Sequence, residues 1–369
     1  MEAEMIRYER KKPSIIIIII VIVAAFASFN LSTFFLKKII NNIIDGIAGR
    51  NDFTIYHLLY VVSILLFFFS TMEAFELIRI FLIKEKTVMI RKSALENERA
   101  KLEIIKIKRN AGFSRIISGV LMALFVGLAG LSYVKTGDQQ TYVYTIFILI
   151  LINYFNPVWL IVSSFNKQTN FLLDECDPAA YIDFIELATA EAVKIRNKNY
   201  TGLITIGSYY YLGNYDEMER LINIYESRKI TVREGIHALY YRGAAFINSG
   251  NVSGFNSVVA RLSEIEKRIR LSDNERALVN DIKKRWRIME GALRETSPDT
   301  KELILQQMKK DKGNLFRLEL TYYLAFVQQK NNDEETALLN LKYVAKNGGT
   351  TLFCRNARGI LWSKGISLE

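Results

Sequence analysis

The sequence contains little of the chemistry that most enzymes use. It has two histidines, His57 and His237, which leaves few imidazoles for general-base catalysis. Its two cysteines, Cys176 and Cys354, lie far apart and belong to no CxxC or His/Cys cluster, so neither a zinc site nor a disulfide framework is indicated. No GxxxxGK[ST], GxGxxG, HExxH or GxSxG motif is present. We therefore expect no enzyme activity, no catalytic residue, no cofactor and no bound metal.

Charge is missing from four long apolar stretches, which lie at about 14–36, 53–72, 116–134 and 141–165. A helix needs about 20 apolar residues, each adding about 1.5 Å, to cross a hydrocarbon core about 30 Å thick. All four stretches have this length, so they are predicted to be the transmembrane helices of a membrane domain at residues 1–170. No Asp, Glu, Lys or Arg lies within them, which argues against a proton or ion relay.

The beginning of the chain has two interpretations. Residues 1–27 have a basic start, an Ile-rich core and the sequence Ala25-Phe26-Ala27, as in a cleaved signal peptide. The apolar run continues to Leu36, however, where a polar region should follow a cleavage site, so an uncleaved anchor is favoured. Both interpretations place the next loop outside the cell.

Positive charge predicts the orientation of the spans. The N-terminal tail has four Lys and Arg residues, and the first, second and third loops have three, ten and one. Short loops rich in Lys and Arg stay in the cytoplasm. We therefore expect a multi-pass cell-membrane protein with both termini in the cytoplasm. Its Ile-, Lys- and Asn-rich composition is compatible with a bacterium.

Most of the net charge of +11 belongs to the membrane domain, where 20 Lys and Arg face 12 Asp and Glu. This distribution favours the lipid bilayer as a partner and argues against nucleic acid. The basic cytoplasmic loop at 84–115 is predicted to be a helix continuous with the second span, since it has no Pro and a single Gly, Gly112. It is interpreted either as a solvated juxtamembrane helix or as a coupling helix that contacts the soluble domain, a partner subunit or anionic headgroups.

Two groups of residues stand out within the predicted spans. Asn153 and Asn156 lie on one face of the last span, and Pro157 frees the carbonyl of Asn153 and kinks the helix. This bend either lines a substrate path or makes hydrogen bonds between helices. A ridge of small residues lies on the third span, at Gly119, Ala123 and Gly127. The ridge predicts a close helix contact, within the chain or in a homodimer.

Residues 171–369 are predicted to form a cytoplasmic domain of successive helices, so the whole chain is expected to be all-α. Short turns recur at 212–215, at 249–252 after 37 residues, and at 330–333 after a further 81. An aromatic or small-residue helix precedes each turn and an amphipathic helix follows it. With Tyr209-Tyr210-Tyr211 before the Leu-Gly-Asn-Tyr turn, this region resembles the tetratricopeptide-repeat class of helical hairpins.

The resemblance implies a solenoid-like array of antiparallel helices that presents a concave groove to a protein or peptide. Most tyrosines of the domain are then expected in the core of the repeats. Gly213 is expected in the left-handed conformation that commonly ends a helix. Asp174, Glu175 and Asp177 are explained by the entry into a helix at Pro178.

A basic run marks one helix of this domain, at Lys283, Lys284, Arg285 and Arg287. It is either a solvated helix face around a buried Trp286 or a patch that docks an anionic headgroup or an acidic peptide. The favoured function is a membrane-anchored adaptor that binds a protein or peptide partner through its repeats. The alternatives are an accessory subunit of a peptide or ABC-type export system and an envelope immunity or peptide-sensing protein.

Overall fold

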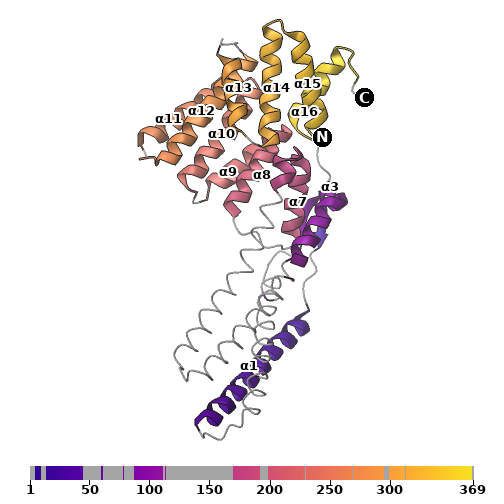
Figure 1. The fold of residues 1–369 in the computed structure, drawn as a ribbon, viewed down its shortest axis with the longest axis vertical. Coiled ribbons are helices and arrows are strands. Elements are labelled where there is room, and N and C mark those ends of the chain that lie inside the picture. The colour runs from indigo at the N-terminus through magenta and orange to yellow at the C-terminus, as the bar shows by residue number, and fades with distance from the viewer. Residues whose placement is uncertain are drawn as a thin grey trace. The chain divides into compact units, whose positions relative to one another are not determined.

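The computed structural model describes residues 5–9, 14–44, 60, 78, 87–110, 113, 169–191, 198–228, 230–268, 270–294, 299–311 and 313–367. These residues are predominantly helical, as predicted (Figure 1). Apart from Tyr60, the predicted spans at 53–72, 116–134 and 141–165 lie outside them, so the four-span organisation stays a prediction. The same holds for two predicted groups, the polar residues Asn153, Asn156 and Pro157 and the ridge Gly119, Ala123 and Gly127.

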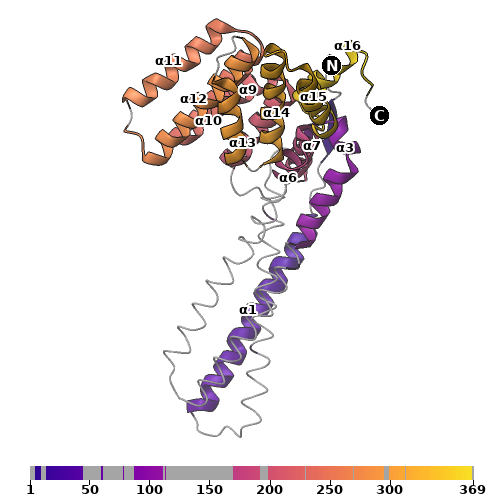
Figure 2. The same ribbon diagram turned by 45° about the horizontal axis from the view of Figure 1, so that its top comes forward.

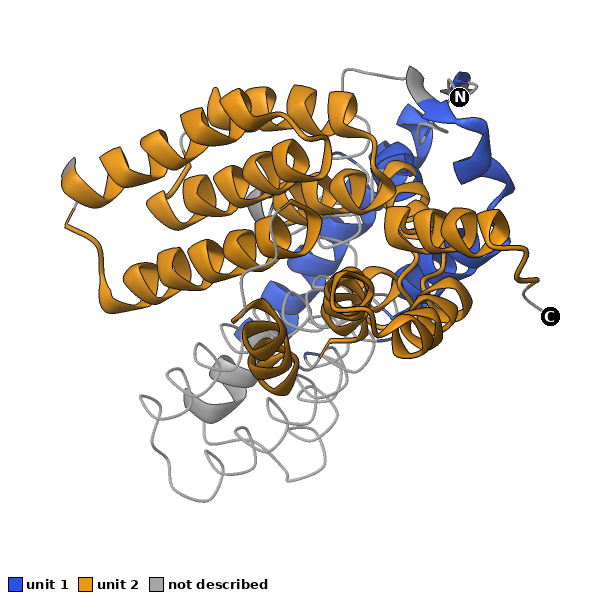
Figure 3. Cartoon of the chain, turned by 90° about the horizontal axis from the view of Figure 1, so that it is seen from above, with its two compact units in different colours: residues 1–166, 187–194 blue, residues 167–186, 195–369 orange. Residues whose placement is uncertain are grey.

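The chain divides into two compact units, each described by itself (Figure 3). Unit 1 comprises Met1–Asn166 and Leu187–Lys194, and unit 2 comprises Lys167–Glu186 and Ile195–Glu369. Residues Leu187–Lys194, which include the last turn of a helix, are thus grouped with unit 1. The domain boundary predicted at residue 170 stays a prediction.

Helix α1 (Ile15–Ile44) is the one candidate membrane span among the described residues. Its segment Ile15–Phe35 has 21 residues and a mean hydropathy of 2.8, which suits a membrane crossing by length and composition. The polar side chains in it bond within the helix: Ser28 Oγ donates to the Ala24 carbonyl at 2.7 Å, and Asn30 Nδ2 to the Phe26 carbonyl at 3.0 Å. Such local bonding is what hydrocarbon requires of polar groups.

A two-stranded sheet in unit 1 was not expected from the sequence. Strand β1 (Met5–Glu9) pairs antiparallel with β2 (Thr87–Arg91), so that Met5 lies opposite Arg91 and Glu9 opposite Thr87. The prediction of one continuous helix over 84–115 is therefore wrong at 87–91. Thr, Val and Ile favour strands. The pairing strand comes from about 80 residues earlier in the chain, so the local sequence does not indicate it.

Helical structure follows directly after β2. Helix α3 (Lys92–Glu96) ends at Asn97, and residues 98–110 are helical again. The side chain of Asn97 accepts a hydrogen bond from the backbone N–H of Ala100 at 3.0 Å, which is the geometry of an N-cap. Residues 87–110 of this loop thus form a strand and two helices.

Unit 2 opens with α6 (Asn170–Leu173) and α7 (Pro178–Ala190). Asp177 Oδ1 accepts from the backbone N–H of Ala180 at 3.0 Å, so Asp177 caps α7 as its position suggested. Nine further helices, here called the helical array, follow in the described part of unit 2: α8 (Lys198–Leu212), α9 (Tyr215–Glu226), α10 (Val232–Asn248), α11 (Val252–Arg268), α12 (Asp273–Leu293), α13 (Thr300–Lys310), α14 (Asn314–Lys330), α15 (Glu334–Asn347) and α16 (Leu352–Ser363).

Alternate helices of the array form its centre (Figure 2). Helices α8, α10, α12, α14 and α16 each pack on the next, and α16 packs back on α8, so we call them the ring helices. Helices α9, α11, α13 and α15 pack against neighbouring ring helices. Contact between α8 and α16, the first and last ring helices, closes the row.

Three turns between helices share one geometry. Gly213, Gly250 and Asn332 have φ values of 70°, 72° and 62°, the left-handed region. The next residue in each turn caps the following helix, because its side chain accepts a hydrogen bond from the backbone N–H three residues later. These capping residues are Asn214, Asn251 and Asp333. The prediction for Gly213 is confirmed, and Asn332 shows that Asn tolerates the same conformation.

Aromatic side chains fill the array. The largest fully buried side chains include Tyr210, Tyr211, Tyr323 and Phe353, which confirms that the tyrosines of the turns' lead-in helices are core residues. Trp286 is also buried, and its Nε1 donates to the Tyr240 carbonyl at 3.2 Å. Large aromatic residues suit this place because each fills much of the space between two ring helices.

The sheet can be tested by a disulfide across it. Ile6 and Ile90 lie directly opposite, so the Ile6→Cys/Ile90→Cys chain should cross-link when membranes are treated with copper phenanthroline. The control Ile6→Cys/Arg91→Cys puts the second thiol on the other face of β2 and should stay reduced. Equal cross-linking in both chains, measured by peptide mass spectrometry, would contradict this register. The two native cysteines are buried and give little background.

Candidate functional site: a buried polar network in the helical array

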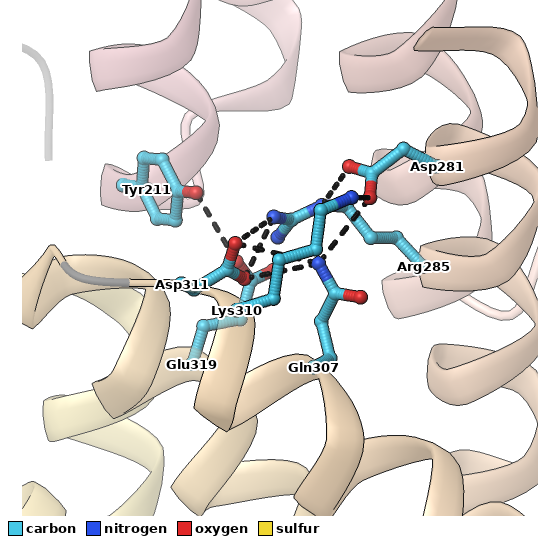
Figure 4. A network of polar contacts seen from close by, with 7 residues as sticks. All are labelled: Tyr211, Asp281, Arg285, Gln307, Lys310, Asp311 and Glu319. Carbon is cyan, nitrogen blue, oxygen red and sulfur yellow. Dashed lines mark hydrogen bonds and ion pairs between the residues drawn. The ribbon is translucent and has the colours of Figure 1, made fainter. Parts of the chain in front are cut away.

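A buried carboxylate lies at the centre of the array. Glu319 is on α14 between Leu318 and Leu320, and only 1% of its surface is exposed. Its Oε1 accepts from the Tyr210 hydroxyl and its Oε2 from the Tyr211 hydroxyl, each at 3.1 Å. Figure 4 shows Tyr211 reaching Glu319 from a separate helix. Because both tyrosines belong to α8, the carboxylate joins ring helices α8 and α14 directly.

A chain of hydrogen bonds ends at the same carboxylate. Tyr323 Oη donates to Asn248 Oδ1 at 3.2 Å, and Asn248 Nδ2 donates to Tyr210 Oη at 3.0 Å. Tyr210 then donates to Glu319. All three donors point the same way, so each bond polarises the next. The chain brings α10 into contact with α8 and α14.

Arg285, on α12, is the cation of the network, with 12% of its side chain exposed. Its Nε bonds Asp281 at 3.0 Å and its Nη2 bonds Asp311 at 2.7 Å (Figure 4). Lys310 Nζ also pairs with Asp281, at 2.6 Å, and Gln307 Nε2 donates to both carboxylates at 3.3 Å. These contacts join α12, α13 and the residue after α13.

Burial and charge set the protonation of the network. Burial raises the pKa of Glu319 to about 7, although Arg285 and the two tyrosine hydrogen bonds act in the opposite direction. Burial also raises the pKa of Tyr210 and Tyr211 well above the ordinary value, which keeps their hydroxyls protonated as donors. Burial opposes the charge of Arg285, but Tyr240, Asp311 and Glu319 outweigh it and raise the pKa of the guanidinium. Glu319 is thus the group that titrates near neutrality.

The predicted basic run is divided by the structure. Lys283 pairs with Glu266 at 2.7 Å, Lys284 approaches Gln306 at 3.5 Å, and Arg287 approaches Asp299 at 3.7 Å. Arg285 belongs to the interior network instead. A docking role for Lys283, Lys284 and Arg287 stays a prediction, while the burial of Trp286 between them is confirmed.

Sequence reasoning missed Glu319, Asp311 and Asn248. The available signal was weak: Glu319 is a lone acidic residue among Leu and Tyr in an apolar helix. Among the described residues, no group of three or more His, Cys, Asp or Glu is arranged to hold a metal ion. The arrangement therefore supports a role in fixing the ring helices and in responding to protons.

Removal of the cation should destabilise the array. Arg285→Ala leaves Asp311 and the buried Glu319 without the guanidinium beside them, so we expect the free energy of unfolding to fall by about 3–5 kcal/mol. The matched control is Arg287→Ala on the same helix, where 63% of the side chain is exposed and the loss should stay under about 0.5 kcal/mol. Urea unfolding of the detergent-solubilised chain, followed by circular dichroism, measures both. Similar losses would contradict the buried network.

The raised pKa of Glu319 predicts a stability that falls with rising pH. Folded Glu319 keeps its proton up to about 7, whereas the unfolded carboxyl loses it near 4.5. The folded state therefore binds more protons between these values, and the free energy of unfolding decreases as pH rises through them and levels off above.

The Glu319→Gln chain is the control, because its amide cannot titrate. Unfolding at pH 5, 6, 7 and 8 should show a decline in the wild type, of a few kcal/mol at most, that is reduced in this variant. Burial lowers the pKa of His237, which acts in the opposite direction but equally in both chains. Identical pH profiles would show that Glu319 does not titrate as described.

The geometry of the network thus joins α8, α10 and α14 through buried hydrogen bonds. It identifies no substrate and no cofactor. No protein-family model, curated protein or solved structure matches this chain, so its function has to be argued from its own residues.

Proposed function

We propose that the chain is a membrane-anchored adaptor or scaffold whose helical array binds a protein or peptide partner. The observation that carries this proposal is an exposed apolar surface on the last two helices. Trp362 on α16 is 83% exposed, and Leu339 and Tyr343 on α15 are exposed as well. We call these three residues the outer face of α15–α16.

The three side chains lie on two helices that pack against each other. Leu339 and Tyr343 are four residues apart, so they share the side of α15 that is opposite to the buried Leu341. An ion pair between Lys364 and Glu334 places the end of α16 beside the start of α15. Trp362 therefore lies at the same end of this helix pair as Leu339. Trp and Tyr are the residues that most often dominate protein interfaces, and clustered exposed apolar groups indicate a contact.

The surroundings of this face indicate the kind of partner. Three basic residues are exposed near this face: Lys342 and Lys346 on α15 and Arg358 on α16. One acidic residue, Glu335, is exposed on the same side of α15. A basic rim around an apolar centre favours an acidic segment that carries an apolar anchor. Tyr210, Tyr211 and Tyr323 are buried in the array, as expected of repeat-core residues, which supports binding on its outside.

Pairing within unit 1 supports the membrane topology. Strands β1 and β2 are hydrogen-bonded, so both must lie on one side of a bilayer, because sheet edges are not tolerated in hydrocarbon. Helix α1 begins six residues after β1. If α1 crosses the membrane, the chain must cross again before Thr87, and the apolar stretch at 53–72 has the required length.

A second contact limits the number of membrane crossings in the same way. Lys108 Nζ pairs with Glu191 Oε2 at 2.8 Å, and both residues belong to unit 1. The chain between them must therefore cross the membrane an even number of times, which the two stretches at 116–134 and 141–165 satisfy. The tail, the loop at 84–115 and unit 2 would share one side. Their positive charge favours the cytoplasm.

Loss of Trp362 should abolish partner binding. We expect a partner that co-purifies with the full-length chain in mild detergent to fall about tenfold or more with Trp362→Ser, as for a hot-spot residue. The matched control is Leu305→Ser on α13, which also removes an exposed apolar side chain. Quantitative mass spectrometry compares the three samples.

An adaptor requires a partner that Leu305→Ser retains and Trp362→Ser loses. Equal recovery of every protein with both variants would contradict the proposal. Recovery of a membrane ATPase in equal amounts with the wild type and with Trp362→Ser would support the accessory-export alternative instead.

A further inference from the structure

The helix at 98–110 in unit 1 has an apolar face on each of two opposite sides. Ala100, Ile104 and Ile107 are buried, and they define the side that packs against protein. Leu102, Ile105 and Phe113, which is also helical, are 55%, 59% and 63% exposed. At about 100° per residue Leu102 and Ile105 lie roughly opposite the buried side, together with Arg109. We call Leu102, Ile105 and Phe113 the exposed stripe.

Basic side chains border the exposed stripe on both sides. Lys101 and Lys108 lie along one edge, and Arg99 and Lys106 along the other, by the same helical spacing. Lys101 and Lys106 pair with Glu98 and Glu103, each three residues away and near the surface. Such exposed pairs contribute little, so the ammonium groups are available to other anions at small cost. An apolar stripe edged by Lys and Arg is the pattern of a helix that lies in a lipid interface.

The position of the helix in the chain brings it close to the membrane. The exposed stripe ends at Phe113, three residues before the apolar stretch at 116–134. Its other end is tied through β2 to β1, and Glu9 at the near end of β1 is six residues from α1. Six extended residues span at most about 20 Å. Both ends of the segment from β2 to Phe113 are therefore held near the surface of the same leaflet.

We propose that the exposed stripe lies in the headgroup region of an anionic leaflet, with its Lys and Arg edges contacting lipid phosphates. The proposal rests on the membrane anchoring in the proposed function and is independent of partner binding by unit 2. Three side chains are too few for a stable contact with a second copy, since a standard protein interface buries about 800 Å² on each side. The basic edges match lipid phosphate, and α1 exposes its apolar side chains in the same way.

Fluorescence quenching by spin-labelled lipid tests this placement. The full-length chain is labelled with NBD at Ile105→Cys or Leu102→Cys and placed in nanodiscs of phosphatidylcholine with phosphatidylglycerol. The matched control is Lys101→Cys, next to Leu102 but about 100° round the helix. Ile20→Cys within α1 reports membrane insertion separately. The wild-type chain, with both cysteines buried, gives the background labelling.

We expect nitroxides at the top of the acyl chains to quench the labels at 105 and 102 about twofold or more above the label at 101, because the stripe faces the acyl chains while the edge stays at the level of the phosphates. The difference should shrink in discs of phosphatidylcholine alone, because the electrostatic contribution is lost.

Equal quenching at 105 and 101, with quenching at 20 retained, overturns the proposal and leaves membrane anchoring intact. Loss of quenching at 20 as well overturns both. A label at 105 that is shielded from water but not quenched by lipid indicates a protein occupant, a second copy included, and also overturns the proposal.

Discussion

The packing of the array depends on how the Glu319 carboxylate is kept in the protein interior. A buried carboxylate is tolerated only when it is hydrogen-bonded, paired or protonated. Tyr210 and Tyr211 supply two hydroxyls from a helix 109 and 108 residues earlier, and Arg285 supplies a nearby positive charge from α12. Few other arrangements of the three helices would give the carboxylate both its hydrogen bonds and its nearby positive charge. The carboxylate therefore fixes the register of α8, α12 and α14, and the aromatic core packs around that register.

The same network separates Arg285 from the other members of the basic cluster in the sequence. Residues 283 to 287 follow one another, but each position is turned by about 100° on the helix. Arg285 consequently points to Asp311 in the interior, while Lys283 and Arg287 face solvent and different acidic partners. A charge inside the array needs several carboxylates and amides around it, which accounts for Asp281 and Gln307. Among the described residues of unit 2, Trp362 is the largest apolar side chain that remains exposed.

We propose different surroundings for the two exposed apolar surfaces, because their borders differ. Trp362 and its neighbours on α15 combine aromatic groups with a loose basic rim, a composition typical of protein contacts. Leu102 and Ile105 form a narrow stripe edged by Lys and Arg, close in sequence to a predicted span, a pattern typical of interfacial helices. For this second surface, the sheet of β1 and β2 and the ion pair of Lys108 with Glu191 support only the proposal that the chain crosses the membrane an even number of times between the paired segments.

The sequence alone determined the properties that depend on neighbouring residues. Helical periodicity predicted the array, the uncharged run predicted the α1 span, and the turn at Gly213 followed from the ease with which glycine adopts a positive φ. Only the tertiary structure decided that 87–91 is a strand, that Arg285 is interior and that Glu319 joins two ring helices. Each of these depends on a partner that comes from elsewhere in the fold, in the first and last cases about 80 to 110 residues away. Local spacing carries no information about which distant group will meet a side chain, because that is settled when the helices pack.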